Sequence, residues 1–282
     1  MSLFRQFSYK KFGILPFDSS EAGEVNQAIY HSYIKIIFLK KGSNITIDFN
    51  NYRLGADALF FINVNQWYKL EIHERPGSGS LIYYNRDFYC VEIHDREVSC
   101  DGILYNNVYE IPVVYLSKEQ SNTVQEILHE IKAEIRNDEP SMEEMLRILL
   151  KKLIIKATRI WKTKHGINSA ETKHEIEFTR KFSQLVELHF KSKHTVADYA
   201  AILSVSPKNL LKRITQNGKV APNDLIKQRI ILEAKRLLAH TGLSVKEIGY
   251  DLGYDDPAYF VRFFTKQTSA SPVEFRKQYK TV

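Results

Sequence analysis

The sequence contains few residues of the kinds that mark secreted, membrane-spanning or disulfide-bonded proteins. Its 282 residues include two cysteines, Cys90 and Cys100, without C-x-x-C spacing. We expect reduced, structural thiols, although a disulfide between them stays open. No apolar run approaches the ~20 residues of a membrane span, and the opening MSLFRQFSYKKFG lacks the apolar segment of a secretory signal. These absences favour a cytoplasmic protein with no membrane partner.

The sequence also lacks the short motifs of common enzyme sites. It has no G-x-S-x-G, P-loop or G-x-G-x-x-G, and GSGS at 77–80 lacks the Lys and helix of a phosphate-binding loop. None of the nine histidines forms H-x-H or H-E-x-x-H. His73 and His94 lie nearest to carboxylates, but satisfied or solvent-exposed strand histidines explain them better. We therefore expect no metal, no cofactor and no enzymatic activity.

Charge is divided unevenly along the chain. Residues 1–170 contain 21 Lys and Arg and 21 Asp and Glu, whereas residues 171–282 contain 19 and 12. The whole net charge of +7 therefore lies in the last 112 residues. A polyanionic partner rewards such an asymmetry, and chance clustering on a solvated face is the alternative.

The first ~115 residues have the pattern of a β domain. Short β-branched and aromatic runs, separated by Asn, Gly, Asp and Pro-Gly, predict strands within 30–42, 44–49, 57–63, 66–73 and 79–85. Their spacing, without helical periodicity, favours a sandwich or barrel. The segment 85–100 has no clear assignment.

Helical periodicity begins near Ser117. Apolar residues recur at three and four positions and predict helices over 118–136 and 141–162. These helices can pack on their own domain or on a second copy of the chain, and both readings stay open. The polar stretch 165–175 predicts a linker. We therefore expect a multidomain α+β protein: a β domain with two following helices over 1–164, the linker, and an all-α domain over 176–282.

The all-α region contains an internal repeat. SPKNLLKRIT (206–215) aligns with DPAYFVRFFT (256–265), and each copy begins with an N-cap residue followed by Pro. Upstream, VADYAAILSVSP aligns with VKEIGYDLGYDDP, whose turn is one residue longer. Ala200 and Gly249 are small residues where two helices could cross closely. Each copy thus reads as helix, short turn, helix, which predicts two helix-turn-helix units.

The second helix of each copy has a buried face and an open face. In the second copy Phe260, Phe263 and Phe264 gather on one side of a helical wheel. A recognition helix needs this division, because one face fixes it to its scaffold while the other enters the major groove. The predicted DNA-binding residues are Lys208, Leu211, Lys212, Thr215 and Gln216 in the first copy and Ala258, Val261, Arg262 and Thr265 in the second.

Residue types on the open faces suit base reading. Arg262 can give a bidentate contact to guanine O6 and N7, and Ala258 and Val261 can touch a thymine methyl. Lys208 and Lys212 suit base or phosphate contacts. Between the copies, 222–242 predicts a rigid helix of roughly 27 Å at 1.5 Å per residue. That length could place the two recognition helices near consecutive major-groove segments, which are about 34 Å apart.

These residues resemble the C-terminal DNA-binding domain of AraC/XylS-type transcriptional regulators. The resemblance covers about 100 residues and rests on Ala234 to Leu238, on Ile248 to Phe264, and on Ser271 to Arg276. Gly249 stands where the family usually has Ala, and Ser269 where it often has Gly. Thr265 replaces a common Lys. The resemblance maps base reading onto Lys208, Leu211 and Lys212, and onto Pro257, Ala258 and Arg262.

The resemblance implies further properties that no motif in residues 1–116 establishes. It implies a cupin-like effector or dimerisation domain at the N-terminus, and a homodimer through the helices of 118–162. Its expected partners are double-stranded promoter DNA, RNA polymerase and a small-molecule effector. Trp67, Tyr68, Tyr83, Tyr84 and Phe88 are the aromatic candidates for an effector pocket, with core packing as the alternative. A non-specific, architectural DNA-binding protein is the alternative function.

Overall fold

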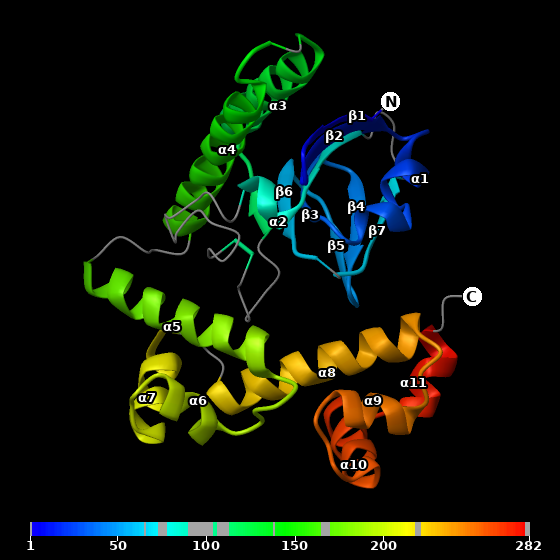
Figure 1. Cartoon of the computed structure of the whole chain (residues 1–282), viewed down its shortest axis with the longest axis vertical. Helices are drawn as coiled ribbons and strands as arrows, with labels where there is room; N and C mark the ends of the chain where they lie inside the picture. Colours follow the sequence, from blue (N-terminus) through cyan, green and yellow to red (C-terminus); the bar gives the residue numbers. More distant parts are fainter. Residues whose placement is uncertain are drawn as a thin grey trace. The chain divides into compact units, whose positions relative to one another are not determined.

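The chain folds into two compact units, residues 1–169 and 170–282. A computed structural model describes residues 2–64, 66–72, 78–89, 104–105, 113–137, 139–164, 170–217 and 221–279 (Figure 1). The histidines considered as metal ligands, His73 and His94, lie outside these ranges, as do both cysteines and residues 165–169 of the predicted linker. In the parts that are described, no helix has the length and apolarity needed to cross a membrane.

The first unit contains two antiparallel sheets. The larger has the order β1-β2-β8-β3-β6-β9, with strands Leu3–Phe7, Lys10–Asp18, Ser78–Tyr84, Ile34–Leu39, Ala58–Ile62 and Val113–Tyr115. The smaller has the order β5-β4-β7, with strands Asn50–Arg53, Ser43–Ile47 and Tyr68–Ile72. All five segments predicted as β contain a strand, whereas β1, β2, β5 and β9 were not predicted. Short helical segments are Ala22–Val25 (α1), the 3-10 turn Ala28–Tyr30 and Arg86–Tyr89 (α2).

The expected β-barrel is not observed in the described part of the chain. The two sheets share no strand pairing there, and each ends in strands with one neighbour. The architecture instead corresponds to the sandwich form of the prediction, because the inner faces of the two sheets enclose one hydrophobic cluster. Leu15, Ile37, Phe60 and Leu81 of the larger sheet meet Ile45 of the smaller sheet in this cluster.

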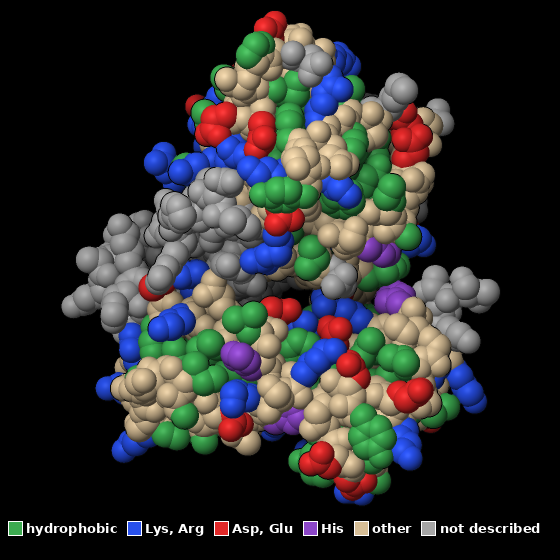
Figure 2. Space-filling view, viewed as in Figure 1, with side chains coloured by type: hydrophobic (Ala, Val, Ile, Leu, Met, Phe, Trp, Pro, Cys, Tyr) green, Lys and Arg blue, Asp and Glu red, His purple; other side chains and the backbone are tan. Residues whose placement is uncertain are grey.

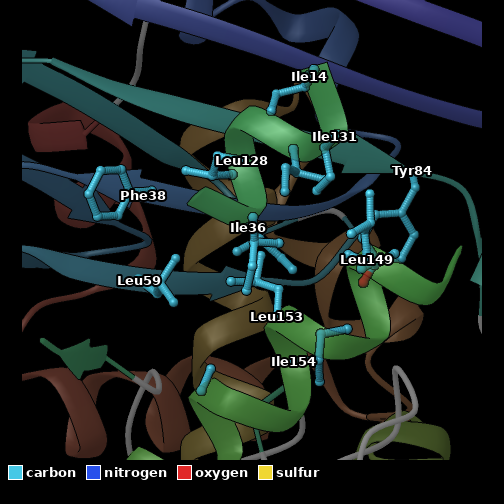
Figure 3. Close-up of a cluster of buried hydrophobic side chains, with 14 of the residues drawn as sticks. Ile14, Ile36, Phe38, Leu59, Tyr84, Leu128, Ile131, Leu149, Leu153 and Ile154 are labelled. Carbon is cyan, nitrogen blue, oxygen red and sulfur yellow. The ribbon is translucent and has the colours of Figure 1, made fainter. Parts of the chain in front are cut away.

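A second cluster lies on the other face of the larger sheet, against two helices. α3 spans Lys118–Asn137 and α4 spans Met142–Lys164. Figure 3 shows Leu128 and Ile131 of α3 and Leu149, Leu153 and Ile154 of α4 beside side chains of the strands. Because both faces of the larger sheet are covered, β3 is buried along its whole length, and its residues are apolar except Lys35. The Lys35 ammonium donates hydrogen bonds to the carbonyls of Tyr30 and His31.

The apolar stripe of α4 therefore packs on its own domain. Leu146, Leu149, Leu150 and Leu153 are buried, whereas Met145, which precedes Leu146, is 44% exposed. Together with Ile148, which is 51% exposed, Met145 lies on the outer side of the helix. The wide apolar face that left dimerisation open is used within the chain.

The aromatic candidates for an effector pocket do not share one site. Tyr84 and Phe88 are buried in the cluster between the larger sheet and the helices. Tyr68 and Tyr83 are buried in the cluster between the two sheets. Because these clusters lie on opposite faces of the larger sheet, the core-packing alternative describes these four rings, and Trp67 is half-buried.

The second unit consists of helices in the described residues. α5 spans Ala170–His189 and thus begins inside the segment predicted as a linker. Ala, Glu and Lys in the first residues of this helix are good helix formers, which outweigh the polar composition that suggested a linker. The remaining helices are α6 (Val196–Ile202), α7 (Pro207–Asn217), α8 (Pro222–His240), α9 (Val245–Asp251), α10 (Pro257–Thr268) and α11 (Pro272–Tyr279).

Candidate nucleic-acid interface

Two helix-turn-helix units lie near the two ends of α8 (Figure 1). α6 and α7 form the first unit, and α9 and α10 form the second. α8 contacts helices of both units and connects them covalently. The predicted repeat is therefore present as two three-dimensional copies within one domain.

The turns of the two units have the same backbone hydrogen bonds. In the first turn these bonds run from the amides of Leu203, Ser204 and Val205 to the carbonyls of Tyr199, Ala201 and Ala200. In the second turn they run from the amides of Leu252, Gly253 and Tyr254 to the carbonyls of Ile248, Tyr250 and Gly249. Each donor and each acceptor in the second turn lies 49 residues after its counterpart in the first turn. Asp255 is the extra residue of the second turn, since the equivalent bonds Leu210 to Ser206 and Phe260 to Asp256 are shifted by 50.

Capping side chains fix where the helices begin. Thr195 and Asp198 form a capping box at α6, and Ser244 and Glu247 form one at α9. Hydrogen bonds from the Thr195 hydroxyl and amide hold the pKa of Asp198 below its ordinary value. Those from Ser244 do the same for the pKa of Glu247. Both carboxylates are therefore charged at the positive ends of their helices.

α7 and α10 begin as the sequence predicts. The Ser206 hydroxyl accepts a hydrogen bond from the amide of Asn209 (3.2 Å). The Asp256 carboxylate accepts one from the amide of Ala258 (2.8 Å). Each helix starts at the following proline.

Small residues allow close packing in the second unit. A Cβ added to Gly249 would lie 3.4 Å from the ring of Phe260, so α9 approaches α10 at this point. Ala200, at the equivalent place in the first unit, is buried. Gly253 has φ +79°, a conformation that glycine adopts without strain. Its counterpart Ser204 adopts φ 55°.

The apolar faces of α7 and α10 are buried. Leu210 and Ile214 of α7 and Phe260 and Phe264 of α10 are fully buried. Phe263, predicted on the same face, is half-buried. These four fully buried anchors fix the rotation of each helix about its axis, and so determine which residues face outward.

The predicted DNA-binding residues lie on the opposite faces. Lys208, Leu211, Lys212, Thr215 and Gln216 are exposed on α7. On α10, Ala258, Arg262 and Thr265 are exposed and Val261 is half-buried. Pro257, mapped only by the family resemblance, is half-buried at the start of its helix.

The hydroxyl protons of Thr215 and Thr265 are used in hydrogen bonds within their own helices. Thr215 donates to the carbonyl of Leu211 (2.7 Å), and Thr265 donates to that of Val261 (2.8 Å). In this rotamer each hydroxyl can accept but not donate a further hydrogen bond. The arrangement is the same in both helices, again at a shift of 50 residues.

Arg262 already has neighbours on its own helix. Its guanidinium lies 3.6 Å from the Asp256 carboxylate and 5.9 Å from the centre of the Tyr259 ring. Arg262 is 68% exposed, Asp256 60% and Tyr259 55%. Tyr259 was not among the predicted DNA-binding residues, although its position three residues before Arg262 places both on adjacent turns of the helix.

The two units differ in charge. α7 contains Lys208, Lys212 and Arg213 and no acidic residue. Arg213 packs on the Phe178 ring, at 3.6 Å from its centre. In the second unit Asp255 and Asp256 precede a helix with two cations, Arg262 and Lys266. Figure 2 accordingly shows basic and acidic side chains intermixed over this domain, rather than one basic patch, on the face in view.

In the part of the chain that the structure describes, no group of three or more His, Cys, Asp or Glu side chains could hold a metal ion.

The region of the two units matches a known domain family. Residues 199–278 match a family described as a helix-turn-helix domain. The chain is 32% identical over 94 residues to the uncharacterised transcriptional regulator YijO of Escherichia coli K12, which is 33% of each protein. It is 33% identical over 94 residues to the arabinose operon regulatory protein of Salmonella typhimurium LT2, covering 34% of that protein.

One relative is similar over most of its length. The transcriptional activator RhaR of E. coli K12 is 22% identical over 251 residues, covering 87% of this chain and 85% of RhaR. Among solved structures, the C-terminal domain of AraT, a response regulator from Geobacillus stearothermophilus, is 30% identical. That match covers 37% of this chain and 87% of AraT's domain, with a TM-score of 0.35.

Proposed function

The helical domain of this chain belongs to the AraC-type helix-turn-helix family, and from that premise we propose that the protein is a sequence-specific regulator of transcription. In this proposal α7 and α10 enter neighbouring major-groove segments of one DNA duplex. The duplicated geometry of the two units carries the proposal. Turn, cap, anchors and open face recur in both, although the sequences of the open faces differ.

The connection between the units supports reading on one face of the duplex. α8 has 19 residues and spans about 28 Å at 1.5 Å per residue. Consecutive major-groove segments on one face are about 34 Å apart. One chain could therefore contact two half-sites.

Each open face would contribute differently to recognition. Arg262 offers the bidentate contact to guanine, while Ala258 and Val261 offer apolar contact to thymine. Lys208 and Lys212, on a helix without acidic residues, would bind phosphates or guanine, with Leu211, Thr215 and Gln216 beside them. Thr265 would accept hydrogen bonds only, as its hydroxyl proton is engaged.

Selection from a random duplex pool tests the proposal. The full chain is expected to enrich a motif with two conserved blocks about one helical turn apart, 10–10.5 base pairs. Enrichment of no motif, with binding that depends only on salt, would identify the alternative, an architectural DNA-binding protein.

The regulatory partners belong to the same proposal. DNA as the partner places the protein in the cytoplasm, at the nucleoid. We extend the activator role in the name of RhaR to this chain, with RNA polymerase as its partner at the promoter. Transcription in vitro from a template bearing the selected motif should rise on addition of the protein. An unchanged or lower transcript level would contradict activation.

The N-terminal unit would serve as the effector or dimerisation domain. For effector binding, thermal unfolding of the full chain against a metabolite panel is the test, and no stabilisation by any compound would contradict it. For a homodimer, the exposed residues Met145 and Ile148 of α4 are the candidates. Sedimentation should then show a dimer that Met145→Glu with Ile148→Glu converts to a monomer, and a monomeric wild type would exclude it.

A further inference from the structure

The loop between α5 and α6, residues 190–195, reaches across to the second helix-turn-helix unit. Lys191 Nζ forms an ion pair with both carboxylate oxygens of Asp251, at 3.0 and 2.7 Å. Asp251 is the last residue of α9, so this contact joins residues 60 positions apart in the chain. The two units are thus connected through this loop as well as through α8.

His194 makes two further contacts from the same loop. Its Nε2 donates a hydrogen bond to the carbonyl oxygen of Leu252 (3.0 Å), which requires the proton on Nε2. Its ring lies 4.7 Å from the centre of the Tyr254 ring. Tyr254 in turn contacts the rings of Phe260 and Phe263, at 5.5 and 5.6 Å. The loop therefore touches the aromatic packing that holds α10.

Gly253 shows how closely the loop approaches the turn. A Cβ at this position would overlap the backbone carbonyl of Lys191. The glycine is required both by this approach and by its φ of +79°. Any residue with a side chain at this position would displace the loop.

The loop is also fixed to its own unit. Tyr199 of α6, fully buried, donates its hydroxyl proton to the carbonyl of Lys193 (2.9 Å). Phe190 is buried beneath the guanidinium of Arg229 of α8, at 3.9 Å. A loop held on both sides transmits the position of one unit to the other. We name the contacts of Lys191 and His194 with residues 251–254 the inter-unit clasp.

We propose that the inter-unit clasp fixes the relative orientation of α7 and α10, so that the protein accepts one spacing between its two half-sites. The inference rests on the proposed function and assigns Lys191 and His194 as positioning residues for spacing specificity. Since α8 joins the units at one end of each, loss of the clasp leaves them able to rotate relative to each other about that connection.

Binding to a series of duplexes tests the proposal. Starting from the selected site, one, two or five base pairs are inserted between the half-sites; five place the second half-site on the opposite face. Wild type should lose about tenfold affinity or more for one or two inserted pairs, the size of a lost base contact. The full-length double variant Lys191→Gln, His194→Ala should lose markedly less.

The matched control is Lys181→Gln, which removes the same charge from an exposed position on α5. It should keep the wild-type spacing profile. Lys191→Gln alone removes only the ion pair, from a side chain that is 47% exposed, and serves as the variant that retains the fold. Identical spacing profiles for wild type and the clasp variants would overturn the proposal.

A second measurement does not depend on DNA. Spin labels on α7 and α10 of the full chain, with both native cysteines replaced by Ser, report the distance between the recognition helices. Wild type should give one narrow distribution and the clasp variants a broader one. If wild type selects no DNA motif, the proposed function fails, while equal distributions in wild type and variants would still refute the clasp.

Discussion

At the residue scale, the proposed function makes Arg262 and Asp256 the residues that determine what α10 offers to DNA. Asp256 caps α10 through Ala258 and lies within ion-pair distance of Arg262. Both side chains are more than half exposed, so the pair is weak and breaks at little cost. The guanine contact proposed for Arg262 therefore competes with only a weak internal contact.

Arg262→Ala should weaken binding to the selected site by about 1–3 kcal/mol and relax the preference at one base position. Lys266→Ala, on the same helix, serves as the comparison and should weaken binding to all sequences alike. Competition binding against single-base variants of the site measures both. Equal weakening on all sequences by Arg262→Ala would reassign the arginine to a phosphate contact.

Two substitutions of Asp256 separate its role as a helix cap from the effect of its negative charge. Asp256→Asn keeps a side-chain acceptor for the Ala258 amide and should leave stability nearly unchanged, whereas Asp256→Ala should cost about 0.5–2 kcal/mol. Because the carboxylate repels phosphates, Asp256→Asn should also bind DNA more tightly at low salt. Chemical denaturation and binding titrations give the two readouts. Equal stability of the two variants would show that the cap contributes nothing.

Much of this residue-level picture could be predicted from the sequence. A helical wheel identifies the exposed faces, because 3.6-residue periodicity and the Phe anchors determine which side is buried. Lys191 and His194 could not be predicted in this way, since their partners are 58 to 60 residues away. Local patterns do not encode contacts of that separation.

At the element scale, α5 and α8 are joined by an ion pair beneath the first unit. Arg229 of α8 donates two hydrogen bonds to the Glu187 carboxylate of α5, at 2.5 and 2.9 Å. It also contacts Glu233 one turn along its own helix, at 2.9 Å. Arg229 is 10% exposed and Glu187 47% exposed. The pair therefore lies at the edge of the domain's core.

Glu187→Gln should destabilise the domain, because it leaves the nearly buried guanidinium without one of its two carboxylates. We expect the unfolding free energy to fall by about 1–3 kcal/mol. This is less than the loss of about 3–5 kcal/mol on breaking a fully buried pair, because water reaches Glu187. Denaturant unfolding of the full chain at neutral pH measures it. The control Glu130→Gln removes a carboxylate whose partner, Lys152, is itself 43% exposed. A loss as large for this control would show that the buried guanidinium is not the cause.

The same pair predicts a pH dependence. Burial raises the pKa of Glu187, but the hydrogen bonds and charge of Arg229 outweigh it and hold this pKa below its ordinary value of 4.5. A carboxylate whose pKa is lower in the folded than in the unfolded protein stabilises the fold. This contribution is complete at pH values above the unfolded pKa and is lost as the pH falls through the folded pKa. Unfolding free energies of wild type and Glu187→Gln should therefore converge below pH 4.5. A constant difference would contradict the assignment.

Elements were predicted better than their assembly. Helix periodicity and capping residues are local, so the repeat and its two turns follow from the sequence. Strands β1 and β2 were not predicted, because residues 3–18 mix Lys, Gly and Pro with apolar residues. The sequence left sandwich and barrel open for a related reason. Strand spacing indicates an all-β region but does not determine which strands pair.

At the scale of the whole molecule, the two helix-turn-helix units are alike in backbone and unlike in charge. The charged residues of α7 are all basic, whereas α10 follows two aspartates. Counterion release should therefore come mainly from the first unit. The double variant Lys208→Ala, Lys212→Ala should reduce the slope of log affinity against log salt concentration by the amount expected for about two phosphate contacts.

The central claim is that one chain reads DNA with both units, and a base-by-base scan of the selected site tests it most directly. Affinities of the full chain for every single substitution should show two sensitive blocks about one helical turn apart. Arg262→Ala should relax one position of one block and leave the other block unchanged. A single sensitive block, or no sensitive block at all, would contradict the account.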